Sequence, residues 1–320
     1  MSYAPGEVFV MSSSSGESNS TTLRYLDSQL TTAKCLRFIG MRTQDIGFLL
    51  AHPLVEKIEF VNCTYDMATF VPRTSEHVPG AREVVLADTT YSLVCFDIIF
   101  RSFPKLRKLT YFYPSNEPDN NFDDVATALN NHGRLLEDLA MHNDHSRPFD
   151  NYIGSMAHFS NLKTLEIDLE FLIGFRPIPR GDWDEYTDSP YDVDEEDPDY
   201  DEIHESFGDW SFVELLPTSI ETLTIEVDSP KLQVYFNTYE RFGAKFEELM
   251  TAVEYFPNLK HVEAENLYLV AERAGNRLPN WVIEDSHIMT KRVVTAAEPA
   301  ADAIMSDLSI DSMTDQGEDA

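Results

Sequence analysis

Basic residues and cysteines are scarce in this chain of 320 residues. The 24 Lys and Arg stand against 56 Asp and Glu, which gives a formal net charge of −32. Phosphate binding depends on clustered basic side chains that release counterions, so neither nucleic acid nor an anionic membrane is an expected partner. The three cysteines lie far apart and lack the spacing of a metal site, which is typical of reduced thiols in an intracellular protein.

Long apolar runs and targeting signals are also lacking. No run approaches the roughly 18 residues that a membrane-spanning helix needs. The first thirty residues do not show the basic start and apolar stretch of a secretory signal. We therefore expect a cytoplasmic location, with the nucleus as the alternative, and no membrane partner.

Short catalytic motifs are the third absence. The sequence contains no Gly-x-Ser-x-Gly elbow, phosphate-binding loop, dinucleotide fingerprint or His-Glu-x-x-His motif. His142 and His145 could ligate a metal ion from one helical face, but they follow an expected strand and precede Pro148, which favours a polar loop. We therefore expect no enzymatic activity, no metal and no cofactor. The alternative is a hydrolase whose site lacks these motifs.

What the sequence does contain is a recurring segment with apolar residues at its first, fourth and sixth positions. The fourth and sixth positions follow the two-residue period of a strand, and the first lies in the bend that enters it. The first five of the seven spacings between segments, 22, 26, 25, 30 and 26 residues, fall in or just beyond the leucine-rich-repeat range, and the last two are 58 and 39. The segments begin at Ala33, Val55, Ala81, Leu106, Leu136, Leu162, Ile220 and Leu259.

Helical patterns separate these segments, and several links contain proline, which ends a helix. The combination predicts an α/β leucine-rich-repeat solenoid of about eight degenerate repeats, with a curved parallel sheet on the concave side and helices on the convex side. An ordinary α/β domain is the alternative, but it has no need of a shared six-residue register. The predicted helices cover residues 45–51, 91–102, 122–130, 152–159 and 239–255.

Three stretches carry a resemblance to a known family: residues 52–63, which read HPLVEKIEFVNC, residues 215–223 and residues 256–260. With these motifs, residues 26–270 resemble the leucine-rich-repeat regions of fungal F-box-like proteins. The resemblance implies substrate recognition for a ubiquitin ligase, with cullin-ligase components as candidate partners. An F-box would need about forty helical residues ahead of the repeats, and the serine-rich first 25 residues do not supply one.

We expect the chain to divide into a disordered N-terminus (1–25), a solenoid with a C-terminal cap (26–290) and a disordered acidic tail (291–320). An acidic insertion, residues 176–210, falls within the longest spacing. Its residues 181–210 hold fourteen Asp or Glu and no Lys or Arg, so repulsion is expected to keep the insertion extended. Interleaved aromatic residues such as Trp183 and Trp210 could add contact area for a partner.

Two surfaces are candidates for partner binding. The first is the concave face, at the third and fifth positions of the segments, where we expect a protein partner to contact Lys57, Glu59, Lys108, Asp138, Glu166 and His261. The second is the insertion, which could bind a basic client in the manner of a histone chaperone. Its candidate contacts are Asp192, Asp194, Glu195, Glu196 and Asp197. For both surfaces, a solvated stretch without a partner is the alternative.

Overall fold

The structure is a computed structural model. It describes residues 8–12, 33–41, 54–65, 80–91, 95–113, 122–143, 152–173, 210–226, 243–252, 254–264, 267–274, 278, 280–285 and 287–291, and the structural statements below concern these residues. The predicted helix at 45–51, the insertion before Trp210 and the tail after Lys291 lie outside them.

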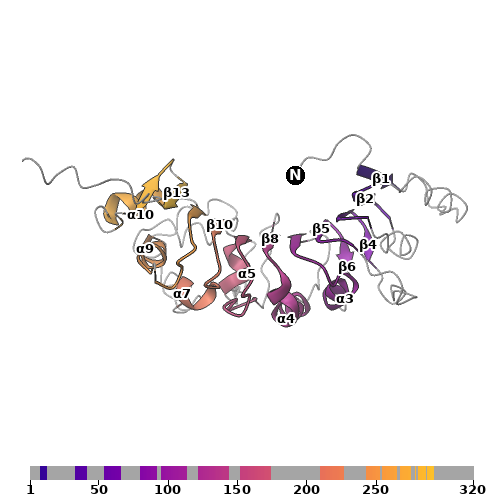
Figure 1. Ribbon diagram of the computed structural model, residues 1–320, viewed down its shortest axis with the longest axis horizontal. Helices are drawn as coiled ribbons and strands as arrows, with labels where there is room; N and C mark the ends of the chain where they lie inside the picture. Colours follow the sequence, from indigo (N-terminus) through magenta and orange to yellow (C-terminus); the bar gives the residue numbers. More distant parts are fainter. Residues whose placement is uncertain are drawn as a thin grey trace, which may run out of the picture.

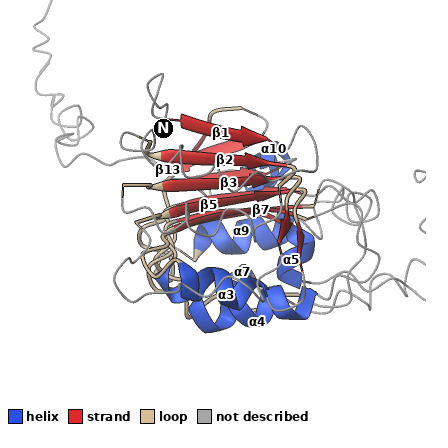
Figure 2. Ribbon diagram, turned by 90° about the vertical axis from the view of Figure 1, so that its right-hand side faces the viewer, coloured by secondary structure: helices blue, strands red, loops and turns tan. Residues whose placement is uncertain are grey.

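The molecule is a curved α/β structure with one layer of strands and one layer of helices. Figure 1 shows the strands along the inner side of an arch and the helices α3, α4, α5 and α7 along its outer side. Figure 2 shows the same two layers from the end of the arch. The eleven strands of the main sheet are, in spatial order, β1 (Val8–Ser12), β2 (Cys35–Ile39), β3 (Lys57–Val61), β5 (Glu83–Ala87), β7 (Lys108–Phe112), β8 (Asp138–His142), β9 (Thr164–Asp168), β10 (Thr222–Glu226), β11 (His261–Ala264), β13 (Ile288–Lys291) and β12 (Trp281–Ile283).

Strands β1 to β11 of this sheet pair in parallel, whereas β13 and β12 pair antiparallel. A small second sheet joins β4 (Thr64–Tyr65) to β6 (Thr90–Tyr91). The helices are α3 (Cys95–Ser102), α4 (Phe122–His132), the 3-10 turn η4 (Gly133–Leu135), α5 (Leu169–Ile173), α7 (Phe212–Leu215), α9 (Ala244–Thr251) and α10 (Leu267–Ala274).

Each of the eight segments predicted as strands contains a strand. The strands begin two residues later than the segments, and all but β11 end one residue beyond them. The fourth-position residues pair directly from strand to strand, as Leu36 does with Ile58 and Leu139 with Leu165, and all eight are at most 1% exposed. Apolar rows of this kind form the core between the sheet and the helices.

The bends that enter the strands also repeat. The backbone N–H groups of Glu56 and Lys57 both donate to the Lys34 carbonyl, at N–O distances of 2.7 and 3.0 Å, and those of Arg82 and Glu83 both donate to the Glu56 carbonyl. Stacked bends therefore pair the backbone groups that the turn leaves without a strand partner.

The helix predictions are right in part. α4 confirms the helix at 122–130, and α3 and α9 lie within longer predicted helices. The helix predicted at 152–159 is wrong because this segment is extended and turned: Gly154 has a φ of 70°, and the Ile153 and Met156 N–H groups donate to the carbonyls of Phe171 and Leu215. The spacing of its buried residues imitates a helix, but its hydrogen bonds join it to neighbouring segments.

Two predicted boundaries also need correction. Residues 8–12 form strand β1, so the disorder predicted for residues 1–25 is wrong there; Phe9 and Met11 pack against the core, which stabilises the strand. Trp210, predicted as part of the acidic insertion, is only 8% exposed and packs edge-on against Phe212 with a centroid distance of 5.0 Å. Its indole belongs to the core because it fills space beside α7.

The sheet ends in an antiparallel hairpin. β13 pairs with β11, β12 pairs with β13, and Leu267 and Val270 of α10 are buried beside them. The indole Nε1 of Trp281 donates to the Met250 carbonyl at 3.1 Å. Within the part of the chain that the structure describes, no helix is both long and apolar enough to span a membrane.

Candidate concave-face binding site

The concave face consists of the side chains that point away from the helices, and the strand register arranges them in three rows. The first row runs through Cys35, Lys57, Glu83, Lys108, Asp138, Thr164, Thr222 and His261. The second row lies two residues further along each strand and runs through Arg37, Glu59, Val85, Thr110, Ala140, Glu166, Thr224 and Glu263. The third row lies at the strand ends, with Ile39, Val61, Ala87, Phe112, His142, Asp168 and Glu226.

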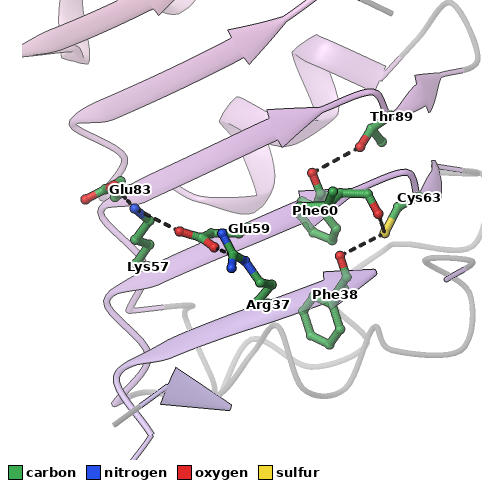
Figure 3. A network of polar contacts seen from close by, with 9 residues as sticks. Arg37, Phe38, Lys57, Glu59, Phe60, Cys63, Glu83 and Thr89 are labelled. Carbon is green, nitrogen blue, oxygen red and sulfur yellow. Dashed lines mark hydrogen bonds and ion pairs between the residues drawn. The ribbon is translucent and has the colours of Figure 1, made fainter. Parts of the chain in front are cut away.

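At the N-terminal strands the first two rows form a chain of ion pairs (Figure 3). Arg37 Nε contacts Glu59 Oε2 at 2.5 Å, and Lys57 Nζ contacts Glu59 Oε1 at 3.0 Å and Glu83 Oε1 at 2.6 Å. Burial lowers the pKa of Lys57, but the hydrogen bonds to Glu83 and Glu59 outweigh it and leave the pKa raised. These four side chains carry two positive and two negative charges, so they neutralise one another.

The ends of the same strands are linked by neutral groups. Cys63 Sγ donates to the Phe38 carbonyl at 3.4 Å, and Thr89 Oγ1 donates to the Phe60 carbonyl at 3.2 Å (Figure 3). Both residues are at most 1% exposed. Each joins its own strand end to the preceding strand, so Cys63 and Thr89 are core residues that link neighbouring repeats.

At the C-terminal strands the third row holds a histidine between carboxylates. His142 Nδ1 lies 3.5 Å from Glu226 Oε2, and His142 Nε2 lies 3.6 Å from Glu166 Oε1. The ring stacks on Phe112 with a centroid distance of 4.7 Å, which orients it. The hydrogen bond to Glu226 raises the pKa of His142, with Glu166 and Asp168 adding to the effect against burial.

Beneath this histidine lies a buried polar network. The Asn143 backbone N–H donates to Asp168 Oδ2, and Asn143 Nδ2 donates to Glu170 Oε2 at 2.8 Å. All three side chains are at most 2% exposed. Burying a carboxylate costs free energy unless hydrogen-bond donors stabilise it. The Asn143 N–H therefore fixes the Asp168 side chain at the end of β9.

The predicted contacts that the structure describes all lie on the concave face. Lys57, Lys108, Asp138 and His261 stand in the first row, and Glu59 and Glu166 stand in the second. Lys57 and Glu59 come together in the N-terminal ion pairs, Lys108 pairs with Asp138 across β7 and β8, and His261 Nε2 lies 3.8 Å from Glu263 Oε2. The insertion residues Asp192, Asp194, Glu195, Glu196 and Asp197 lie outside the described residues.

Sequence reasoning missed the third row. The expected strands ended one residue too early, and His142 was assigned to a polar loop, whereas it is the last residue of β8. A seventh position added to each segment would have shown His142, Asp168 and Glu226 in three successive strands. Their ligand atoms all lie within 4.8 Å of one another, which is compatible with a metal ion.

A second correction concerns Cys35. It stands at the third position of its segment, where an exposed side chain is expected, but it is only 2% exposed. Burial raises the pKa of its thiol to about 11.

No protein-family model matches this chain, and no curated protein matches it. The function proposed below therefore depends on the geometry and charge of the concave face.

Proposed function

We propose that this protein is a non-enzymatic interaction protein that binds a protein partner on its concave face. The observation that carries the proposal is a charge imbalance at the concave positions of β9, β10 and β11. Glu166, Asp168, Glu226 and Glu263 stand there, and these three strands place no Lys or Arg at their concave positions. A basic segment of a partner lying across the strands would neutralise Glu166, Glu226 and Glu263, which are partly exposed. Asp168 is buried and already held by the Asn143 N–H, so it adds negative charge beneath this surface without contacting the partner.

The arrangement of the strands supports a leucine-rich-repeat solenoid of about eight degenerate repeats as the scaffold. Strand, bend and apolar rows recur together along the sheet, and the helices lie on its outer side. Such a scaffold presents one side chain per repeat in each row, so a partner is contacted over an extended surface rather than in a deep cleft.

The resemblance to fungal F-box-like proteins supports a role in selecting substrates for a ubiquitin ligase, with cullin-ligase components as further partners. Under this proposal the concave face selects the substrate, in the cytoplasm or the nucleus. The second candidate is an acidic repeat protein that holds basic clients such as histones through the insertion 176–210 and the tail. The acidic concave positions favour this candidate because their negative charge adds to that of the insertion and the tail.

Peptide display tests the concave face directly. Peptides selected from a random library on the full chain at low salt are expected to be rich in Lys and Arg. They should bind about tenfold or more weakly to a Glu166→Lys/Glu263→Lys variant, since like charges then face the peptide. The matched control is Glu214→Lys/Glu254→Lys, which reverses two exposed glutamates outside the sheet.

The outcomes separate the two candidates. Equal binding to both charge-reversed variants would reject the concave face as the binding surface. Binding that survives both reversals but is lost when residues 182–209 are deleted, and that collapses in salt, would instead support the insertion as the binding element.

A further inference from the structure

Three side chains from consecutive strands converge at one point of the third row. His142 ends β8, Asp168 ends β9 and Glu226 ends β10, and one potential ligand atom from each lies within 4.8 Å of the others. Ligands around a first-row metal ion at about 2.1 Å from it are separated by roughly 3 to 4 Å. The Nδ1 atom of His142 and Oε2 of Glu226 already lie 3.5 Å apart, within that range, and the Glu226 side chain is 41% exposed.

We propose that His142, Asp168 and Glu226 bind a divalent transition-metal ion, with Zn²⁺ as the first candidate. One imidazole nitrogen beside carboxylate oxygens suits Zn²⁺ and its first-row neighbours, whereas Mg²⁺ and Ca²⁺ prefer oxygen ligands alone. The two carboxylates supply two negative charges, which match the charge of the ion.

Neighbouring side chains orient the three proposed ligands. Histidine ligands typically donate their other ring N–H to a carboxylate, which fixes the tautomer. Here Glu166 faces Nε2 of His142 at 3.6 Å, so Nδ1 is turned toward Glu226 and is the ligand atom. Phe112 stacks on the ring, and the Asn143 N–H holds the buried Asp168 carboxylate in place.

An ion at this point would join β8, β9 and β10 across the longest interval between segments, the 58 residues from Leu162 to Ile220. Three protein ligands leave at least one coordination position for water or for a donor from a partner. The site would therefore link three neighbouring strands and also lie at the proposed binding surface. Its existence does not depend on the identity of a partner.

Zn²⁺ titration by calorimetry of the chelator-stripped full chain tests the site. Excess Mg²⁺ is included so that the acidic segments are occupied by a cation that prefers oxygen. We expect one Zn²⁺ per chain, a higher melting temperature with Zn²⁺, and affinity weaker by about tenfold or more in Glu226→Gln. The matched control is Glu263→Gln, which removes a glutamate beside His261 on the next strand and should leave the affinity unchanged.

Two results would overturn the proposal. One is the same Zn²⁺ affinity in the unmodified chain and in Glu226→Gln, provided that thermal unfolding shows both metal-free proteins to be folded. The other is an equal loss in Glu263→Gln, because the binding would then reflect the general acidity of the face. A Glu166→Gln variant serves as a second check, since it should weaken Zn²⁺ binding without removing a ligand.

Discussion

The N-terminal and C-terminal strands of the sheet share one backbone register but differ in the balance of charge at their concave positions. At β2, β3 and β5 the concave side chains form a neutral chain of ion pairs from Arg37 to Glu83. At β9, β10 and β11 the carboxylates outnumber the basic groups at concave positions, and His142 stands between two of them. A partner must break existing pairs to bind the first region, whereas it can neutralise surplus charge at the second.

The strand ends repeat this contrast. In the N-terminal region the buried links are a thiol and a hydroxyl, Cys63 and Thr89, each bonded to a backbone carbonyl. In the C-terminal region they are the side chains of Asn143, Asp168 and Glu170. Each neutral link contributes little to the free energy of unfolding, so its removal is expected to destabilise the fold only slightly. Buried carboxylates depend on their donors, so the C-terminal region is expected to be the more sensitive to substitution.

The largest effect is expected at Asn143. Asn143→Ala removes the side-chain donor to the buried Glu170 carboxylate, which should lower the free energy of unfolding by about 2 to 4 kcal/mol. Urea denaturation followed by circular dichroism measures the change. Asn161→Ala is the control, because Asn161 is exposed and its Nδ2 donates to the uncharged Arg134 carbonyl; its cost should stay below about 1 kcal/mol. Equal costs would show that the buried network does not distinguish the two regions.

A pH series separates the regions through His142. The pKa of His142 in the folded protein is raised from 6.5 by the hydrogen bond to Glu226, against burial and with help from Glu166 and Asp168. Its contribution to stability is therefore fully present below pH 6.5 and is lost as the pH rises through the higher folded pKa. Relative to His142→Gln, the unmodified chain should lose stability as the pH rises above 6.5 and passes through the raised pKa of His142, measured with a chelator present. Parallel stability curves for the two proteins would contradict this coupling.

Much of this fold was predictable from the sequence because apolar residues at positions four and six face a single core. Leu36, Ile58 and their counterparts must share one side of a strand, so the eight strands and their pairing order follow from the pattern. The helices were less predictable. Ile153, Met156 and Phe159 have helical spacing, yet their segment is extended, because its hydrogen-bond acceptors lie in neighbouring segments that local sequence does not specify.

The candidate site was predictable only in its first two rows. Alternation along a strand identifies residues such as Lys57 and Glu166 as outward-facing, whatever the length of the strand. The third row depends on where each strand ends, and strand ends are set by pairing with the neighbours. His142 was for that reason assigned to a loop, and Asp168 and Glu226 were not selected. The burial of Trp210 was unpredictable for a similar reason, since it follows from packing against Phe212.

A smaller effect is expected from Thr89, which donates to backbone carbonyls, whereas Asn143 donates to buried carboxylates. Thr89→Val keeps the shape of the side chain but removes the hydroxyl, which lies within hydrogen-bond distance of the Ala87 carbonyl at 2.9 Å and of the Phe60 carbonyl at 3.2 Å. The loss should be about 1 kcal/mol in the free energy of unfolding, clearly less than for Asn143→Ala. Thr89→Ser, which keeps the hydroxyl and removes one methyl group, separates the hydrogen bond from packing. A cost for Thr89→Val as large as that of Asn143→Ala would remove the proposed contrast between neutral and charged strand ends.

The smallest effect is expected in the N-terminal ion pairs. A double-mutant cycle with Lys57→Gln and Glu83→Gln should give a coupling of about 0.5 kcal/mol at low salt, because both side chains remain partly open to water. The coupling should shrink as salt is raised, since exposed charges are screened. Glu59 keeps its contact with Arg37 in the Lys57 variant, so the neighbouring pair is preserved. A salt-independent coupling above about 2 kcal/mol would place a strong electrostatic network in the N-terminal region as well, and the charge contrast between the two regions would then be one of sign alone.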